Sequence, residues 1–463
     1  MGTELLAPLD LAFWHLESEA HPMHLGALAV FSPDPGATGG VGTGTVLDLL
    51  ATRAAAIPRL RMRVRDVLLP VGGAAWFVDK DFDVRRHIEC VRLSGEEARA
   101  GDAGFMAGAT RLAGELMERP LERGRPPWRM YVIGGADGGP FAVLVKLHHA
   151  LADGMRAVAI GAGIFDEIAP LARRAPAGAS PARPCAVPPR SWMPGPRQVA
   201  GLALGRIEDL GRAFGVGASL VRASRLDPRG TPALTARSSG TRRLSTADLD
   251  LATVQEIRRA AGGTVNDVLL AVVAGALRRW LLERGETLPA DDPRALVPVS
   301  RRRPGRPVTS GNKLSAYLLA LPVGEPDPRQ RLLRVRTAMD GNKAAGPLRG
   351  AGAVAVLADQ LPSLAHRFGA PIAGGAARML FDLLVTSVPL PRSALSLGGC
   401  PLRAVYPMAP LARGQALAVA LSVYGGRVHL GLVADGKALP DLDRLAAGTR
   451  DEVGELRALL AGT

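Results

Sequence analysis

The chain has 463 residues, of which 47% are hydrophobic and 22% charged. It can therefore bury a large core, and we expect more than one lobe. The formal net charge of +14 favours anionic partners such as an acidic membrane surface or a phosphorylated cofactor. Aromatic residues make up only 4% of the chain and the arginines are scattered, so we expect no nucleic-acid partner.

The three cysteines, Cys90, Cys185 and Cys400, lie far apart and form no CxxC pair. This spacing predicts neither a zinc site nor a disulfide framework, and it fits a reducing cytosol. The first 25 residues lack the basic start and apolar run of a secretory signal. No apolar run reaches the roughly 18 residues of a membrane-spanning helix. We therefore expect a cytoplasmic protein whose membrane contact, if any, is peripheral and on the inner face of the cell membrane.

The first third of the chain alternates strand and helix patterns. A near-continuous apolar run at 141–147 predicts a buried strand. The Gly-rich stretch 36–44 lacks the GK[ST] ending of a phosphate loop and predicts a flexible surface loop. The other expected elements are a strand at 25–31, a strand and turn at 76–83 and helices at 46–56, 102–118 and 154–168.

A change of composition separates two expected lobes. Residues 176–196 are dense in Pro, Ala and Arg, which is typical of a linker. Residues 199–223 are compatible with a basic amphipathic helix on a membrane or with an ordinary surface helix. We therefore expect an amino-terminal lobe at 1–170, a linker at 171–238 and a carboxy-terminal lobe at 239–463.

The second lobe again mixes helix and strand patterns. The sequence predicts a hairpin around Gly425-Gly426, with strands at 416–424 and 427–433. The other expected elements are helices at 246–261, 265–282, 330–342 and 441–460 and strands at 295–299 and 313–321.

The strongest chemical feature follows the strand at 141–147, where His148-His149 precedes Asp153-Gly154. An imidazole titrates near neutrality, so a histidine at a strand end can accept a proton from an alcohol. Asp153 is close enough in sequence to fix the ring or the backbone of the turn. Gly154 permits a close backbone approach or an unusual dihedral angle. A structural histidine pair stays open, whereas a metal site lacks a third ligand and an HExxH pattern.

The HHxxxDG run resembles the signature of the coenzyme A-dependent acyltransferase superfamily. Over nearly its whole length the chain is similar to one branch, the bacterial wax ester synthase/diacylglycerol acyltransferase family. The matching segments are LDLAF at 9–13, PMHLG at 22–26, PRLR at 58–61, DFD at 81–83 with His87, RPL at 119–121, RPPW at 125–128, VKLHH at 145–149, TVNDV at 264–268, GALR at 275–278, PVS at 298–300 and GN at 311–312.

The resemblance implies an α/β fold of two chloramphenicol acetyltransferase-like lobes. Each has a mixed sheet flanked by helices, and an active-site tunnel at the interface holds acyl-CoA and an alcohol. It implies that His149 is the general base, that Asp153 organises the site and that Asn266 is a polar group at the active centre, able to donate to an oxyanion. The expected supporting residues are His148, Gly154 and Asp267.

Two segments depart from the family pattern. In 386–391, Ser387 replaces an Asn and Leu390 replaces a Gly, and 422–426 lacks the Asp of an SYDG-like turn. These changes leave the expected base in place but leave the acceptor open.

The leading hypothesis is an O-acyltransferase. It would move a long-chain acyl group from acyl-CoA to a fatty alcohol or diacylglycerol, forming wax ester or triacylglycerol. One alternative is an acyltransferase for a specialised-metabolite hydroxyl or amine, and another is a non-catalytic acyl-CoA- or lipid-binding protein. We expect acyl-CoA as co-substrate, no permanently bound cofactor and no metal, and the sequence does not identify the CoA-binding residues. The basic charge fits either solubility or salt-sensitive binding to anionic lipid, at the membrane or at a lipid droplet.

Overall fold

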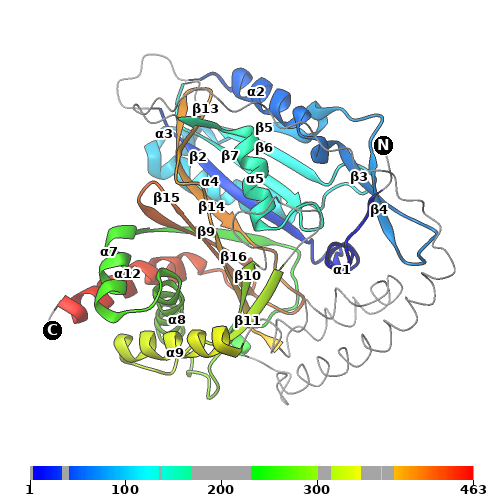
Figure 1. Cartoon of the computed structure of the whole chain (residues 1–463). Helices are drawn as coiled ribbons and strands as arrows, with labels where there is room; N and C mark the ends of the chain where they lie inside the picture. Colours follow the sequence, from blue (N-terminus) through cyan, green and yellow to red (C-terminus); the bar gives the residue numbers. More distant parts are fainter. Residues whose placement is uncertain are drawn as a thin grey trace, which may run out of the picture.

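The computed structural model describes residues 4–33, 41–134, 138–168, 231–300, 314–345, 367 and 380–461. Within these ranges the chain forms two lobes, each built on one mixed sheet flanked by helices (Figure 1). The first sheet has seven strands and the second has six, and a three-stranded sheet lies at the margin of the first lobe. The predicted two-lobed α/β architecture is confirmed.

The first-lobe sheet has the order β5-β6-β7-β2-β14-β13-β8 and is antiparallel except for the β5–β6 pair. Its central strands are apolar and buried, as the sequence predicts for 25–31 and 141–147. The strands are β5 (Ile88–Arg92), β6 (Trp128–Gly134), β7 (Phe141–His148), β2 (His24–Phe31), β14 (Cys400–Met408), β13 (Ala394–Leu397) and β8 (Asp166–Ile168).

Helices cover both faces of this sheet. Phe31 and Val143 face α2 (Thr43–Ala56) and α5 (Gly154–Ile164), whereas Leu28 and Leu144 face α4 (Gly101–Glu118). The alternation of buried side chains along β2 and β7 sends successive residues to the two cores. The short helix α3 (Gly95–Arg99) precedes α4.

The three-stranded sheet, in the order β1-β4-β3, flanks α1 (Pro8–Leu16). Its strands are β1 (Glu4–Leu5), β3 (Met62–Asp66) and β4 (Ala74–Val78). Short 3-10 helices, η1 (Pro58–Arg61) and η2 (Val84–His87), lead into β3 and β5. This sheet and α1 lie on the same side of the first lobe (Figure 1).

The second-lobe sheet has the order β11-β10-β12-β15-β16-β9. The β10–β12 and β12–β15 pairs are parallel, and the other pairs are antiparallel. The strands are β11 (Leu314–Ala320), β10 (Arg294–Ser300), β12 (Leu383–Val388), β15 (Leu417–Tyr424), β16 (Arg427–Asp435) and β9 (Arg242–Asp250), preceded by η3 (Pro232–Leu234).

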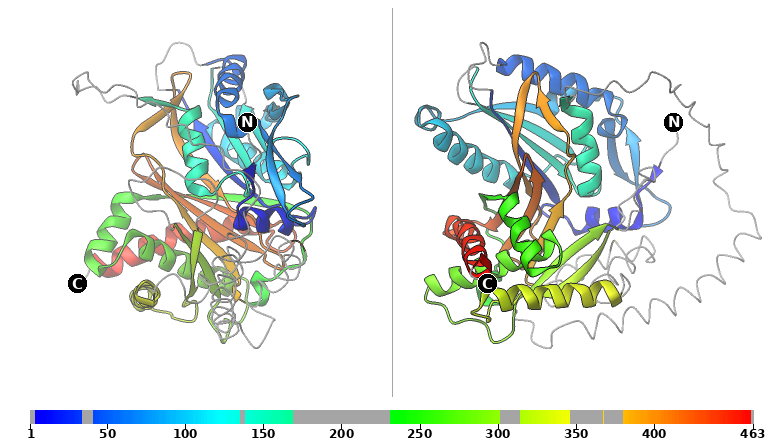
Figure 2. Two further views of the ribbon diagram at one scale, coloured as in Figure 1. Left: turned by 45° about the vertical axis from the view of Figure 1, so that its right-hand side comes forward. Right: turned by 60° about the vertical axis from the view of Figure 1, so that its left-hand side comes forward.

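Four helices gather on one face of this sheet (Figures 1 and 2). They are α7 (Leu251–Ala261), α8 (Val265–Glu283), α9 (Pro328–Ala345) and α12 (Leu442–Ala461). Every residue from Val268 to Leu277 in α8 is buried, which explains the apolar sequence of this stretch.

The other face of the second-lobe sheet packs on the first lobe. Leu144 from β7, Leu244 from β9 and Ala418 from β15 share one hydrophobic core with α4. A Cβ at Gly431 of β16 would lie 2.0 Å from the carbonyl oxygen of Pro407 in β14, so only glycine allows this approach of the two strands. The lobes therefore share a core, and β13 and β14 carry the carboxy-terminal half of the chain into the first-lobe sheet.

Two predicted helix boundaries are wrong. Residues 246–250 belong to strand β9, because they pair with β16 in register, and α7 begins at Leu251 after the Asp250 N-cap. The predicted helix 154–168 ends at Ile164, because residues 166–168 pair with β13 as strand β8. In both places pairing with a distant strand overrides the local helix pattern.

The remaining predicted elements that fall on described residues are confirmed within a few residues at their ends. The predicted linker at 176–196 and the amphipathic helix at 199–223 lie outside the described residues, as does most of the Gly-rich stretch 36–44. The lobe boundaries near 170 and 239 stay predictions.

In the described ranges, no single helix combines the length and the apolar composition of a membrane span. Helices α7 and α8 reach that composition only together, and they are bent by 101° at their junction.

Candidate active site

Strand β7 ends in the HHxxxDG turn, and the neighbouring strand β2 holds this end. His24 of β2 lies opposite His148 of β7 in the antiparallel register. The backbone N–H of His149 donates to the carbonyl oxygen of Met23 at 2.8 Å. The N–H of Ala150 donates to Nδ1 of His148 at 3.0 Å. The turn is therefore fixed to the sheet on both sides of His149.

The ring of His149 stacks on Phe13 of α1, with centroids 3.9 Å apart and planes inclined by 19°. The residue is half-buried. Burial lowers the pKa of His149 to about 4, because the charged ring loses its hydration, and a hydrogen bond to its own backbone and the charge of Asp153 oppose this shift only in part. The imidazole is therefore neutral at pH 7 and can accept a proton.

A buried carboxylate lies behind the turn. Oε1 of Glu17 is 3.1 Å from Nε2 of His24 and 3.4 Å from Nε2 of His148. Burial alone would raise the pKa of Glu17, but its contacts with His148 and then His24 outweigh burial and hold that pKa far below its usual range. Burial also lowers the pKa of His24, to about 4. Glu17 therefore stays ionised and orients the two buried histidines.

Lys146 lies on β7 two residues before His148 and is buried. Its Nζ donates to the carbonyl oxygen of Leu116 at 2.8 Å and to that of Arg119, at the carboxyl end of α4. Burial, with the nearby Arg129 and Arg119, lowers the pKa of Lys146 to about 7. This lysine connects β7 to the end of α4, where carbonyl groups otherwise lack partners.

Asp153 is buried and forms the N-cap of α5, where its Oδ1 accepts from the N–H of Arg156 at 2.8 Å. The following Gly154 does not have a positive φ. A Cβ at Gly154 would meet only Val388 of β12, at 3.9 Å, among the described residues. The structure thus shows no unusual dihedral angle and no close protein contact at Gly154.

Asn266 and Asp267 lie in the first turn of α8. Oδ2 of Asp267 accepts from the N–H and the hydroxyl of Thr264 at 2.8 and 2.7 Å, and the N–H of Asp267 donates to the hydroxyl of Thr264 at 3.2 Å. This capping box starts the helix. Asn266 is half-buried beside it.

The structure brings His148, His149 and Asp153 together on one strand end and the helix that follows. Helix α8 packs mainly on α12, α9 and α7 of the second lobe. An oxyanion role for Asn266 therefore stays a prediction.

Sequence reasoning missed the residues that hold the histidines from behind. Phe13 and Met23 lie in segments that carry the family resemblance, but neither has a reactive group, and Glu17 lies between those segments. The only local signal was that Glu17, a charged residue, stands between two apolar segments. Such a pattern by itself indicates only a surface loop.

The altered segment 386–391 lies at the site. Val388, the last residue of β12, faces Gly154 at the start of α5, and Leu390 packs against the first-lobe core. Tyr424, in the second altered segment 422–426, is buried, and its hydroxyl oxygen accepts from the N–H of Leu395 at 2.7 Å. The departure at 386–391 therefore neighbours Gly154 of the HHxxxDG run.

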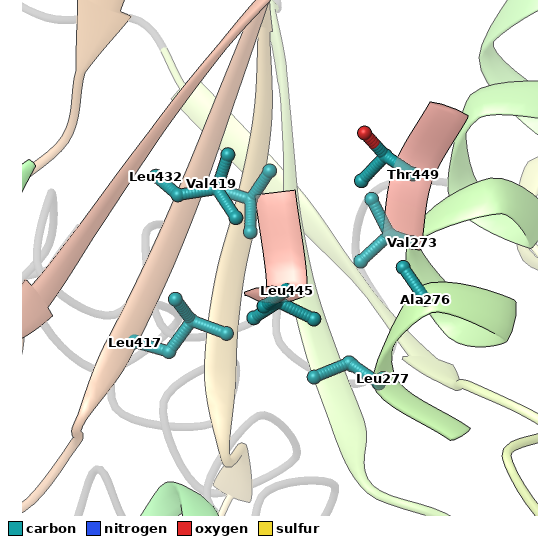
Figure 3. A pocket seen from close by; sticks show the side chains of 8 residues that line it. All are labelled: Val273, Ala276, Leu277, Leu417, Val419, Leu432, Leu445 and Thr449. Carbon is teal, nitrogen blue, oxygen red and sulfur yellow. The ribbon is translucent and has the colours of Figure 1, made fainter. Parts of the chain in front are cut away.

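A small apolar cavity lies inside the second lobe, between α8, α12, β15 and β16 (Figure 3). Its internal volume is about 10 Å³, and its lining includes Val273, Leu417 and Leu445 but no residue of β7 or α5. Such a volume holds roughly one water molecule, so this cavity is too small for a long acyl chain. Among the described residues, no group of three histidines, cysteines or carboxylates is placed to hold a metal ion.

Two sequence profiles match the chain. The profile of the wax ester synthase/diacylglycerol acyltransferase catalytic domain covers residues 6–269, which include His149, Asp153 and Asn266. The profile of the WS/DGAT C-terminal domain covers residues 310–457.

Curated relatives align along almost the whole chain. The probable diacylglycerol O-acyltransferase tgs1 of Mycobacterium tuberculosis is 31% identical over 467 residues, which span 98% of this chain and 96% of that protein. The probable diacylglycerol O-acyltransferase tgs2 of the same species is 30% identical over 465 residues, 98% of each chain.

Solved structures share the fold. The wax ester synthase/diacylglycerol acyltransferase from Marinobacter aquaeolei VT8 superposes with a TM-score of 0.69 at 23% identity and covers 99% of this chain and 100% of its own. A variant of the starter condensation domain of rhizomide synthetase RzmA, in complex with C8-CoA, superposes with a TM-score of 0.55 at 16% identity and covers 100% of this chain and 95% of its own. The profile that spans more than half of the chain and the relatives at 30–31% identity show that the chain belongs to the wax ester synthase/diacylglycerol acyltransferase family and is an acyltransferase.

Proposed function

We propose that this protein transfers a long-chain acyl group from acyl-CoA to the hydroxyl of a diacylglycerol or a fatty alcohol, with His149 as the general base. The observation that carries this proposal is the ring of His149, which is neutral, stacked on Phe13 and held at the end of β7. The names of the mycobacterial relatives and the complex of a similar fold with C8-CoA support the choice of substrates.

The reaction needs one proton to move twice. His149 would take the proton of the alcohol as its oxygen attacks the thioester carbonyl, and would then give that proton to the departing CoA sulfur. A positioned base contributes roughly 10²–10⁴-fold in rate. The neutral form of His149 is the form that can begin this sequence.

Asn266 is the proposed donor to the oxyanion of the tetrahedral intermediate. Its side-chain amide can donate without a change of charge, and such a donor contributes on the order of 10²–10³-fold. The capping box of Thr264 and Asp267 fixes the first turn of α8, which carries Asn266. Asp153 would act through the turn, because it caps α5 directly after the histidine pair.

A second acceptor class rests on a separate observation. The segment with Ser387 and Leu390 also contains Val388, which faces Gly154, so its changes lie close to the HHxxxDG run. A specialised-metabolite hydroxyl or amine is the alternative acceptor.

The test is the release of CoA from palmitoyl-CoA with hexadecanol, with diacylglycerol, with a panel of smaller alcohols and amines, or with no acceptor. Wild-type protein is compared with His149→Ala, His149→Gln and Asn266→Ala, and circular dichroism checks that each variant is folded. We expect acceptor-dependent release that falls roughly 10²–10⁴-fold in both His149 variants and roughly 10²–10³-fold in Asn266→Ala.

The outcomes separate the hypotheses. Release with the small acceptors alone would assign the specialised-metabolite class. Binding of acyl-CoA without release with any acceptor would indicate a lipid-binding protein. Full activity in a folded His149→Gln variant would exclude His149 as the base.

A further inference from the structure

The turn between β3 and β4 carries an exposed apolar tip. This hairpin tip, residues 67–73, contains no charged or hydrogen-bonding side chain. Leu68 is 91% exposed, Leu69 76% and Val71 56%. Three neighbouring large apolar side chains in water are unusual, because isolated exposed residues are the rule on protein surfaces.

The hairpin tip has a defined shape. The N–H of Val67 donates to the carbonyl oxygen of Gly73 at 3.0 Å, and the N–H of Gly73 donates to that of Pro70 at 2.8 Å. Pro70 has no N–H group, and Gly72 takes a φ of +78° that suits the turn. Several of its backbone polar groups thus have partners within the turn, which lowers the cost of moving it out of water.

The three-stranded sheet adds one exposed apolar residue near the tip. Leu5 of β1 is 51% exposed and lies opposite Ala75, close to the end of β4 that joins the hairpin tip. The exposed Arg65 directly precedes the tip with Asp66, while Arg63 lies 3.4 Å from Asp79. The base of the hairpin is thus close to electrically neutral, and the apolar residues dominate its character.

We propose that the hairpin tip inserts into the surface of a phospholipid bilayer. Leu68, Leu69 and Val71 would enter the boundary between the headgroups and the acyl chains, where apolar side chains gain by leaving water. The net charge of +14 on the chain adds a long-range attraction to anionic lipid. A short projecting turn suits insertion, because a stable protein partner needs a broad buried area of about 800 Å² per side.

The position of the hairpin tip relates it to the proposed active site. Nε2 of His15 lies 3.0 Å from the carbonyl oxygen of Gly72, so α1 contacts the tip. The same helix carries Phe13, which stacks on His149. A bilayer at the hairpin tip would therefore lie on the α1 side of the first lobe, which is the side that carries Phe13 (Figure 1). The docking itself rests on the hairpin alone and does not depend on which acceptor the enzyme uses.

The test is sedimentation of the full chain with vesicles of phosphatidylcholine and phosphatidylglycerol, without substrate. The double variant Leu68→Ser/Leu69→Ser is compared with a control, Leu282→Ser/Leu333→Ser, which changes two partly exposed leucines (49% and 51%) on α8 and α9 of the second lobe. We expect wild type and control to bind alike and the hairpin variant to bind about a hundredfold more weakly, because two leucine side chains no longer gain by leaving water.

A second measurement keeps the test independent of folding. A Leu69→Trp variant should lose indole fluorescence with vesicles that carry brominated acyl chains, and it should not do so with unbrominated vesicles. Equal binding of the hairpin variant and the control, or no quenching of the new tryptophan by brominated vesicles that bind the protein, would overturn the proposal. Absence of wild-type binding to the vesicles of phosphatidylcholine and phosphatidylglycerol would overturn it as well.

Discussion

One carboxylate, that of Glu17, contacts both buried histidines behind the HHxxxDG turn. The hydrogen bond from the N–H of Ala150 holds only the Nδ1 atom of His148. The orientation of the ring therefore also needs a partner from outside β7. Glu17 follows α1, which also places Phe13 on the ring of His149. Glu17 is thus a positioning residue, since its contacts reach the base through its neighbours.

Replacing Glu17 by Gln keeps the shape of the side chain and removes its charge. We expect kcat to fall about tenfold while KM for acyl-CoA changes little, because a hydrogen bond to a charged group contributes roughly 1.5–3 kcal/mol. Steady-state kinetics checks this expectation. The matched control is Glu19→Gln, an exposed carboxylate two residues further along the chain, which should leave both constants unchanged. An increase in KM alone would contradict the positioning role.

The pKa of His149 determines the acid side of the pH profile. The base acts when neutral, and burial lowers its pKa to about 4, so lowering the pH removes the active form only near and below that value. We expect kcat/KM to stay level on the acid side down to about pH 5 and then to decline. A decline with a midpoint near 6.5, the value of an unperturbed imidazole, would show that the ring is hydrated in the free enzyme.

At the scale of elements, helix α8 packs closely on its neighbour α12 because Gly275 has no side chain. A Cβ at Gly275 would lie 2.0 Å from Cδ of Glu452. Glu452 is buried, and its Oε1 accepts from Nη2 of Arg331 in α9 at 2.7 Å. Gly275 therefore leaves room for an ion pair that joins α9 and α12.

Replacing Gly275 by Ala should lower the free energy of unfolding by about 1–3 kcal/mol, because the added methyl group displaces the Glu452 carboxylate. An exposed helical glycine behaves oppositely, since alanine is favoured there by up to about 1 kcal/mol. Gly454 of α12 is such a position, with no atom within 4 Å of its added Cβ. Urea unfolding of Gly275→Ala and Gly454→Ala compares the two. Stabilisation by Gly275→Ala would contradict this account.

Elements also show where local patterns mislead. The sequence predicts a helix from 246, yet Asp248 and Asp250 lie in β9, where both pair with β16. Asp248 accepts from the hydroxyl of Tyr406 in β14 at 3.0 Å and lies 2.6 Å from Nδ1 of His429. These partners are more than 150 residues away in the sequence, so a prediction from a short sequence window around Asp248 cannot take them into account.

At the scale of the whole molecule, the two lobes are joined by shared strands and a shared core. Strand β14 pairs with β2 of the first lobe and packs on β15 and β16 of the second. Leu144, Leu244 and Val433 belong to one core. Neither lobe can complete its core without residues from the other half of the chain.

We therefore expect one cooperative unfolding transition for the full chain. Urea unfolding of a Trp280→Phe variant is followed by far-ultraviolet circular dichroism and by tryptophan fluorescence. The substitution removes the buried tryptophan of α8, so that the fluorescence no longer reports on this helix. Coincident midpoints are expected for a two-state transition. Separate midpoints would show that the lobes unfold independently.

The sequence by itself determined the family, the two-lobed α/β class and the buried strand that leads to His148 and His149. It could do so because continuous apolar runs and the HHxxxDG run are local signals. Only the tertiary structure decided that Phe13, Glu17 and Met23 surround the histidine pair, and that 394–408 completes the first sheet. These contacts depend on strand pairing between residues more than a hundred positions apart, and such pairing is set by the core as a whole.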